Sequence, residues 1–164
     1  MDIKAKKSTA RMRSTIAGIL AFVWMCVIFA FSAQTKEESS AVSSEFSYRV
    51  ANTTGLILHL NLDEEQIREM ANAIEGYVRK GAHMTEYAIL AILLYVWLSR
   101  WHISCLRMAF MAAALAVFYA CSDEFHQLFV AGRAGKVSDV LIDSAGAVLG
   151  LALFLCSRIC ANRV

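Results

Sequence analysis

Polar side chains with helical spacing occur in three separate parts of the sequence. Lys80, His83 and Tyr87 lie at positions i, i+3 and i+7, so one face of a helix would present all three. Two further pairs are four residues apart, so that each pair can point at one neighbouring helix: Asp123 with Gln127, and Asp139 with Asp143. Groups that share a helix face can act together, either on a ligand or on each other.

Imidazole and carboxylate groups in these three parts could perform acid–base chemistry. A histidine titrates near neutral pH and is therefore suited to act as a general base. A neighbouring carboxylate could orient that histidine. The candidate catalytic residues are His83, Asp123, Glu124 and His126.

Metal binding is an open alternative for the same residues. His83-x-x-Glu86 and Asp123-x-x-His126 have the i, i+3 spacing with which helical bundles supply imidazole and carboxylate ligands. Neither pair is a diagnostic signature, so a divalent metal ion is an open alternative and no other cofactor is indicated. The sequence does not identify which residues would be the metal ligands.

A basic loop between the second and third polar parts could bind an anion. Arg133 and Lys136 lie beside Gly132 and Gly135, whose backbone can approach a phosphate closely. The alternative is a buried ionic network, for example Arg133 bridging Asp123, that only locks helices together. The candidate binding residues are Lys80, Glu86, Tyr87, Gln127, Arg133, Asp139 and Asp143.

The composition indicates that helices in a membrane position these residues. Of the 164 residues, 58% are hydrophobic, 18% are charged and none is proline, whereas soluble domains carry about 25% charged residues. We predict an all-α polytopic membrane protein, a four-helix bundle in a single domain over residues 1–164. The predicted spans are 14–34, 81–100, 105–122 and 138–158; the last three can cross only by carrying ionisable residues into the bilayer.

The predicted external segment, residues 35–80, contains an amphipathic helix. Asp63 followed by Gln66 is a capping pattern, and apolar residues follow at helical spacing. This segment is expected to lie on the outer membrane surface or, alternatively, to form a lid over a site. Within the last span, Gly146-x-x-x-Gly150 predicts close helix packing. The five cysteines are expected to be small buried residues rather than disulfides.

Basic residues predict the orientation of the bundle. Five of them precede the first span, which places the N-terminus in the cytoplasm: Lys4, Lys6, Lys7, Arg11 and Arg13. Four spans return the C-terminus to the same side. All candidate site residues then converge on the outer face of the bacterial cytoplasmic membrane.

Several short motifs together resemble the VanZ-like membrane proteins. These motifs are Phe31-Ser32-Ala33-Gln34 with Ser39 and Ser43, Lys80-x-x-His83-x-x-Glu86-Tyr87, Asp123-Glu124-x-His126-Gln127, Gly132-Arg133, Ser138-Asp139, Gly146 and Gly150. Ala131 stands where that family often has proline. The resemblance implies a role at the cell envelope, because the family's namesake is associated with resistance to the glycopeptide antibiotic teicoplanin.

Two functions follow from these observations. The first is a protein that binds an envelope lipid, a lipid-linked cell-wall precursor or a glycopeptide at its outer face. The second is a membrane-embedded hydrolase or transferase that modifies a lipid-linked substrate through His83, Asp123, Glu124 and Arg133. Whether the chain is an enzyme stays undecided, membrane lipids are expected partners, and no nucleic acid is expected.

Overall fold

The computed structural model describes residues 3–101 and 103–161, which form α-helices and one short 3-10 turn without any strand. The elements are α1 (Ile3–Ser32), α2 (Lys36–Ile57), α3 (Glu64–Leu98), η1 (Ser99–Trp101), α4 (Cys105–Gln127) and α5 (Val137–Ala161). The predicted all-α class is confirmed. Residues 1–2 and 162–164, at the ends of the predicted domain, lie outside the described residues.

Four of the helices are long and apolar enough to cross a membrane, as predicted. They are Lys7–Ser32, Glu64–Trp101, Cys105–Gln127 and Val137–Ala161. The shortest, α4, has 23 residues and is therefore about 35 Å long, which exceeds a hydrocarbon core of about 30 Å. It reaches this length by continuing through Asp123, Glu124 and His126, so ionisable residues do extend the apolar blocks.

The external segment and the second span are not separated by a break. α3 is one helix of 35 residues, and its N-cap is Asp63, whose side chain and that of Gln66 form the predicted capping box. The predicted boundary between residues 80 and 81 lies inside this helix, because the chain has no proline to end it there. α2 precedes it, so the external segment contains two helices.

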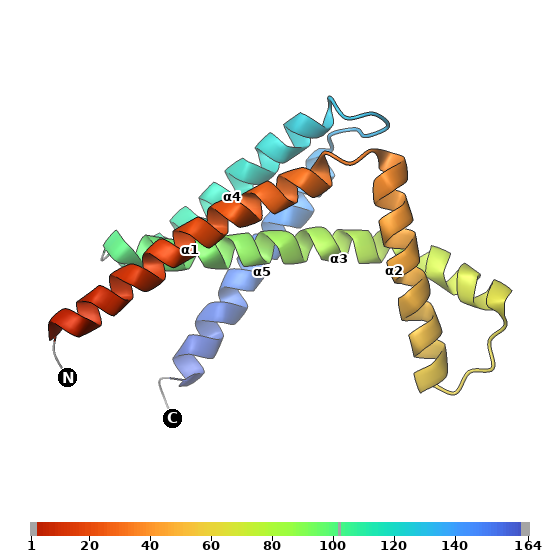
Figure 1. Cartoon of the computed structure of the whole chain (residues 1–164), viewed down its shortest axis with the longest axis horizontal. Helices are drawn as coiled ribbons and strands as arrows, with labels where there is room; N and C mark the ends of the chain where they lie inside the picture. Colours follow the sequence, from red (N-terminus) through yellow and green to blue (C-terminus); the bar gives the residue numbers. More distant parts are fainter. Residues whose placement is uncertain (1–2, 102, 162–164) are drawn as a thin grey trace.

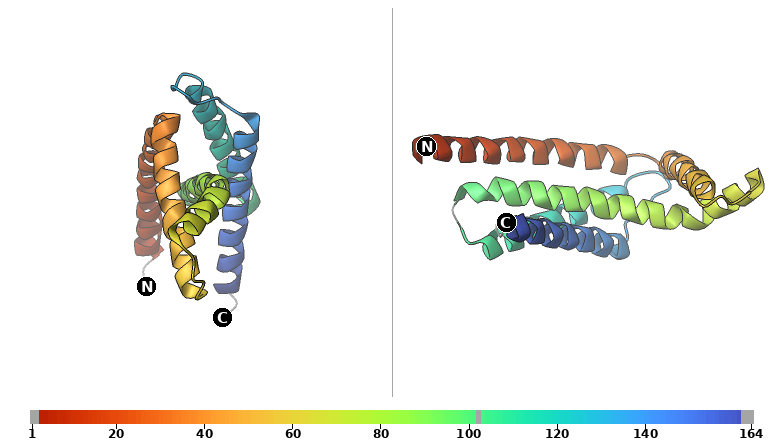
Figure 2. Two further views of the ribbon diagram at one scale, coloured as in Figure 1. Left: turned by 90° about the vertical axis from the view of Figure 1, so that its right-hand side faces the viewer. Right: turned by 90° about the horizontal axis from the view of Figure 1, so that it is seen from below.

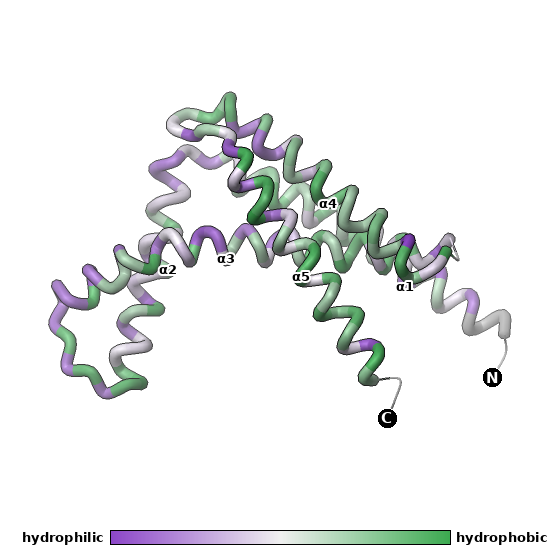
Figure 3. The backbone as a smooth tube through the Cα atoms, turned by 180° about the vertical axis from the view of Figure 1, so that it is seen from behind, coloured by the Kyte–Doolittle hydropathy of each residue, from purple (hydrophilic) through white to green (hydrophobic). Residues whose placement is uncertain are grey.

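α3 occupies the centre of the molecule. It contacts α1, α2, α4 and α5, and the left-hand view of Figure 2 shows it end-on between α1 and α5. α2 crosses the first half of α3 at a steep angle (Figure 1), away from the end where α1 begins and α5 ends. Figure 3 shows hydrophilic residues concentrated in α2, the first half of α3 and the loop before α5.

Two glycines allow α5 to pack directly on α3. A Cβ added to Gly146 would overlap the backbone of Met84, and one added to Gly150 would overlap Ala88. The predicted close packing at Gly146-x-x-x-Gly150 is therefore observed. Nearby, the buried core includes Tyr87, Leu90, Ala91, Ala116, Ala120, Ala147 and Leu151.

The contact between α2 and α3 is partly apolar and partly polar. Ala51 of α2 is buried with Ile67 and Ala71 of α3. One turn further along, the Ser43 hydroxyl donates to a Glu75 carboxylate oxygen at 2.8 Å. These contacts hold α2 against the half of α3 that precedes the apolar block.

The expectation of buried cysteines is wrong. All five cysteines are free and exposed on the surface of the described helices. Because a lipid bilayer is itself apolar, a thiol on the outer surface of a spanning helix needs no protein around it.

The glycine contact generates a stability prediction. Gly146→Ala places a methyl group against the Met84 backbone and should lower the free energy of unfolding by about 1–3 kcal/mol, as overpacking typically does. Gly76→Ala is the control, because a Cβ there meets nothing within 4 Å. Thermal unfolding of the two purified variants in detergent measures the difference; equal stability would contradict the close α3–α5 contact.

Candidate functional site

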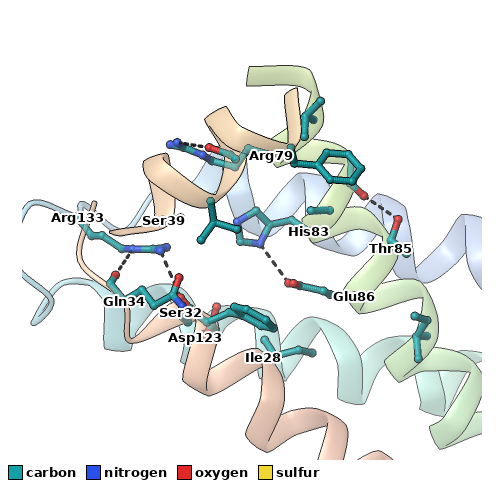
Figure 4. A pocket seen from close by; sticks show the side chains of 18 of the residues that line it. Ile28, Ser32, Gln34, Ser39, Arg79, His83, Thr85, Glu86, Asp123 and Arg133 are labelled. Carbon is teal, nitrogen blue, oxygen red and sulfur yellow. Dashed lines mark hydrogen bonds and ion pairs between the residues drawn. The ribbon is translucent and has the colours of Figure 1, made fainter. Parts of the chain in front are cut away.

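A cavity of about 670 Å³ lies between α1, α2 and α3, and one of its ends is closed by α4 and the loop before α5. Figure 4 shows polar side chains from these elements pointing into it. The candidate residues that line it are His83, Glu86, Asp123 and Arg133. Its apolar wall consists of Trp24, Ile28, Phe31, Val42, Phe46, Val78 and Ile89.

His83 projects from α3 into this cavity between two carboxylates. Its Nδ1 atom lies 3.7 Å from Oε2 of Glu86 and 3.9 Å from Oδ1 of Asp143. The Nδ1 atom is buried and forms no hydrogen bond. Figure 4 shows the same ring directed into the cavity, with Nδ1 toward Glu86. The structure therefore brings the His83 imidazole close to Glu86 and Asp143, two of the residues named as binding candidates from the sequence.

Two candidate residues lie behind the cavity rather than in its wall. Asp143 of α5 is 1% exposed and Tyr87 of α3 is completely buried. Both Asp143 carboxylate oxygens and the Tyr87 hydroxyl lack a hydrogen-bond partner. Buried polar atoms are rarely left unpaired, so each of these three oxygens is available to a hydrogen-bond partner.

Asp123 is anchored by the end of α1 and by its own helix. The Gln127 amide donates to the Ser32 hydroxyl at 3.1 Å and to Oδ2 of Asp123 at 3.4 Å. Oδ1 of Asp123 is buried and unpaired. Gln127 thus positions Asp123, which keeps one free oxygen at the wall of the cavity.

Arg133 caps the C-terminal end of α1. Its Nε donates to the Gln34 carbonyl at 2.8 Å and its Nη2 to the Phe31 carbonyl at 3.3 Å. The preceding residue, Gly132, has a φ of 72°, a left-handed conformation that glycine adopts without strain. Partial burial is the main cause that lowers the pKa of Arg133 from its ordinary value, although an arginine stays charged in proteins.

The alternative in which Arg133 bridges Asp123 is not observed. None of the ion pairs among the described residues includes Arg133. Its two hydrogen bonds use only part of a guanidinium that has five donors. Arg133 therefore presents to the cavity a guanidinium that forms no ion pair, although the carboxylates of Asp123, Glu124 and Glu86 are close enough to act on its charge.

Glu124 supports the loop that carries Arg133. Its Oε2 accepts a hydrogen bond of 2.8 Å from the Lys136 backbone N–H. A Cβ on Gly135 would overlap the Glu124 carbonyl, so this loop lies directly on α4. Glu124 is buried and does not line the cavity.

Arg79 lines the cavity and was absent from the residues singled out in the sequence. Its Nη2 donates to the hydroxyls of Ser40 and Ser43 at 2.9 and 3.0 Å and pairs with Glu75 at 3.0 Å. Its spacing from His83 and Glu86 is i, i+4 and i+7, which places the three on one face. Other lining residues are Ser32, Gln34, Ser39 and Ser43, which belong to the first sequence motif but were not named as candidate site residues, and Thr85.

Three further candidate residues lie outside the cavity wall. Lys80 is exposed on α3, one residue beyond the face that carries Arg79. The His126 ring packs on Phe29 with 4.5 Å between ring centroids. Asp139 accepts a hydrogen bond from the Ser138 hydroxyl at 3.1 Å.

The metal-ligand spacings do not converge on a metal centre in the described part of the chain. There, no group of three or more His, Cys, Asp or Glu side chains is arranged to hold a metal ion. His83-x-x-Glu86 faces the cavity, whereas His126 does not line it. The four side chains of the two pairs therefore do not all face the same space.

The comparison with known proteins agrees with the motifs. Residues 17–159 match the VanZ/LLP1 family, which covers nearly the whole chain and every cavity-lining residue. No curated protein and no solved structure matches the chain. This protein, with four candidate membrane spans and a cavity between α1, α2 and α3, belongs to the VanZ/LLP1 family.

Proposed function

We propose that the protein binds an anionic lipid of the cell envelope in the cavity between α1, α2 and α3. The observation that carries this proposal is the guanidinium of Arg133, which forms no ion pair, at the polar end of a cavity whose wall is otherwise largely apolar. An amphiphile with an anionic headgroup matches both parts. A soluble anion would use only one.

The apolar wall fits the chain of a lipid. Trp24, Ile28 and Phe31 follow one another along α1, and Val42 and Phe46 of α2 face them across the cavity. Val42 and Phe46 are more than half exposed in the unoccupied protein. Covering them with a lipid chain would bury apolar surface, which stabilises the complex.

The polar end fits a phosphate. Three donor positions of the Arg133 guanidinium remain after its two hydrogen bonds to α1 carbonyls. Guanidinium groups bind phosphate oxygens through paired, charge-assisted hydrogen bonds. Arg79 contributes less, because Glu75 already pairs with its charge.

The size of the cavity favours a lipid over a glycopeptide antibiotic. Ligand pockets of about 300–1,000 Å³ enclose small molecules, and this cavity of about 670 Å³ lies in that range. A lipid headgroup with part of its chain is of that size, whereas a whole glycopeptide is larger. A link to teicoplanin resistance would therefore act through a lipid or lipid-linked wall precursor.

The distribution of basic residues supports an assignment of the cavity to the outer face of the bacterial cytoplasmic membrane. The lysines and arginines before the first span lie at the opposite end of the bundle from the cavity, as the course of α1 in Figure 1 shows. Positive residues stay in the cytoplasm. We therefore assign both termini to the cytoplasm and α2 to the outer surface.

Lipid binding can be measured through Trp24, which lines the cavity. In a Trp97→Phe, Trp101→Phe background, a minor fraction of brominated phosphatidylglycerol in phosphatidylcholine nanodiscs should quench Trp24 more than the same fraction of brominated phosphatidylcholine. Arg133→Gln should weaken this preference about tenfold, equivalent to about 1.4 kcal/mol.

Lys136→Gln is the matched control, because Lys136 lies in the same loop but does not line the cavity. It should keep the preference for the anionic lipid. Arg133→Lys retains the charge and separates loss of charge from loss of the α1 cap. Equal quenching of Trp24 by both lipids in the Trp97→Phe, Trp101→Phe protein with Arg133 intact would refute the proposal.

The orientation is tested by cysteine labelling in intact cells. In a variant whose five native cysteines are alanine, Asn61→Cys in the exposed α2–α3 turn should react with a membrane-impermeant maleimide. Arg100→Cys, in η1 at the other end of α3, should react only after the cells are opened. The reverse pattern would invert the assignment.

A second candidate function is a hydrolase or transferase that modifies the bound lipid. It is favoured by one specific observation: the His83 imidazole projects into the cavity beside Glu86 and Asp143, while Asp123 presents an unpaired oxygen. His83 would act as a general base, and Asp123 would orient the reacting group.

The enzyme hypothesis predicts turnover that depends on His83. The purified protein, incubated with a total lipid extract of envelope membranes, should change the mass of at least one anionic lipid. His83→Gln should abolish that change while Trp24 quenching by phosphatidylglycerol is retained. If the protein with His83 intact leaves all lipid masses unchanged, the enzyme hypothesis is wrong and only the lipid-binding function remains.

A further inference from the structure

The environment of His83 Nδ1 is unusual for a histidine in a cavity wall. This nitrogen is buried and has no hydrogen bond, although two carboxylates lie within 4 Å of it. The other ring nitrogen, Nε2, is not among the buried unpaired atoms, and the ring extends into the cavity. The two nitrogens therefore face different surroundings.

The two carboxylates that could pair with Nδ1 differ in how deeply they are buried. The Glu86 side chain is 21% exposed and lines the cavity, so that water can reach it. The Asp143 side chain is 1% exposed, and both of its oxygens lack partners. An unpaired buried carboxylate is far more costly than a hydrated one, so Asp143 gains most from a hydrogen bond to His83.

We propose that Asp143 is a positioning residue that accepts a hydrogen bond from Nδ1–H of His83 and thereby leaves Nε2 as the proton acceptor in the cavity. The proposal rests on the proposed function only in that both concern the same cavity. The present separation of 3.9 Å needs to shorten by about 1 Å for a hydrogen bond, which rotation of the two side chains supplies without a shift of either helix.

The packing of α5 on α3 makes Asp143 the fixed member of this pair. Asp143 is three residues from Gly146, which touches the Met84 backbone, and His83 precedes Met84. Neither helix can shift here without breaking that contact. The geometry thus holds the carboxylate against one edge of the imidazole, whatever occupies the cavity.

Among the described residues, only Glu86 and Asp143 have a carboxylate oxygen within 4 Å of a His83 nitrogen. The Tyr87 hydroxyl, also on α3, is itself unpaired. Asp123 of α4 already accepts a hydrogen bond from Gln127 at 3.4 Å. Arg133, from the loop, donates to carbonyls of α1.

With this tautomer, the cavity combines a proton acceptor and a cation. Nε2 of His83 can accept a hydrogen bond from a hydroxyl or a water molecule, while Arg133 binds the anion. The ligand class this pairing fits is an anionic lipid whose headgroup also carries a hydroxyl group. A tautomer with Nε2–H would present a second donor instead.

Nitrogen NMR of the full-length protein with ¹⁵N-labelled histidine tests the proposal without any ligand. At a pH about two units above the ordinary histidine pKa of about 6.5, the rings are neutral and their tautomers are distinguishable. The His83 signal, identified by its loss in His83→Gln, should show a protonated Nδ1 and an unprotonated Nε2. A protonated Nε2 at this pH, in either the neutral or the charged ring, would overturn the proposal.

Two matched variants identify the acceptor. Asp143→Ala should reduce the fraction of the Nδ1–H tautomer, and Glu86→Ala should leave it unchanged. If Glu86→Ala alone changes the tautomer, the acceptor is Glu86 and the assignment to Asp143 is wrong. If Asp143→Ala fails to fold, the His83 tautomer in the wild-type protein and in Glu86→Ala still tests the assignment to Asp143. Lipid quenching of Trp24 is independent of these signals, so failure of lipid binding is distinguishable from failure of this proposal.

Discussion

The backbone of α5 touches the backbone of α3 at Gly146 and Met84, and the polar site depends on this contact. In a membrane, helices associate through close packing because lipid provides no hydrophobic force between them. Gly146 and Gly150 leave room for the backbone of α3. One turn toward the polar end of the same contact, Asp143 meets His83. A structural stripe of small residues therefore determines the position of two ionisable ones.

The cost of burying polar groups explains where the remaining site residues lie. Ionisable side chains cost about 2.5–3.5 kcal/mol at the centre of a spanning helix and less toward its ends. Asp123 and Glu124 lie in the last turns of α4, and Asp143 lies within the second turn of α5. Each faces protein, while the lipid-facing residues of α4 include the exposed Phe110 and Phe118.

Much of this arrangement is predictable from the sequence, and the limits have a physical cause. Hydropathy predicts the spans because only a long apolar helix satisfies its backbone in lipid. Helical spacing likewise predicts that His83 and Glu86 share a face. Spacing does not specify how a helix is rotated against its neighbours, and here that rotation places Arg79 in the cavity wall and Lys80 outside it.

The roles of Arg133 and α2 are harder to predict from the sequence, because they too depend on how the elements pack against one another. Charge alone suggests that Arg133 pairs with a carboxylate, yet the carbonyls at the end of α1 are nearer and carry the negative end of the helix dipole. Likewise, an amphipathic pattern indicates an apolar face without identifying what it covers. Here, the face of α2 that carries Val42 and Phe46 lines the cavity.

α2 converts a polar patch on the bundle into a cavity that has a polar end and an apolar wall. Without it, the faces of α1 and α3 that carry Phe31 and Arg79 would open directly onto lipid and headgroups. Ser40 and Ser43 of α2 bind Arg79, so the same helix that supplies apolar wall also restrains one of the two cavity arginines. This leaves Arg133 as the cation available to a ligand. Residues 35–80 are therefore part of the candidate site, and in the proposed function their fixed position on α3 selects a ligand with one apolar and one anionic end.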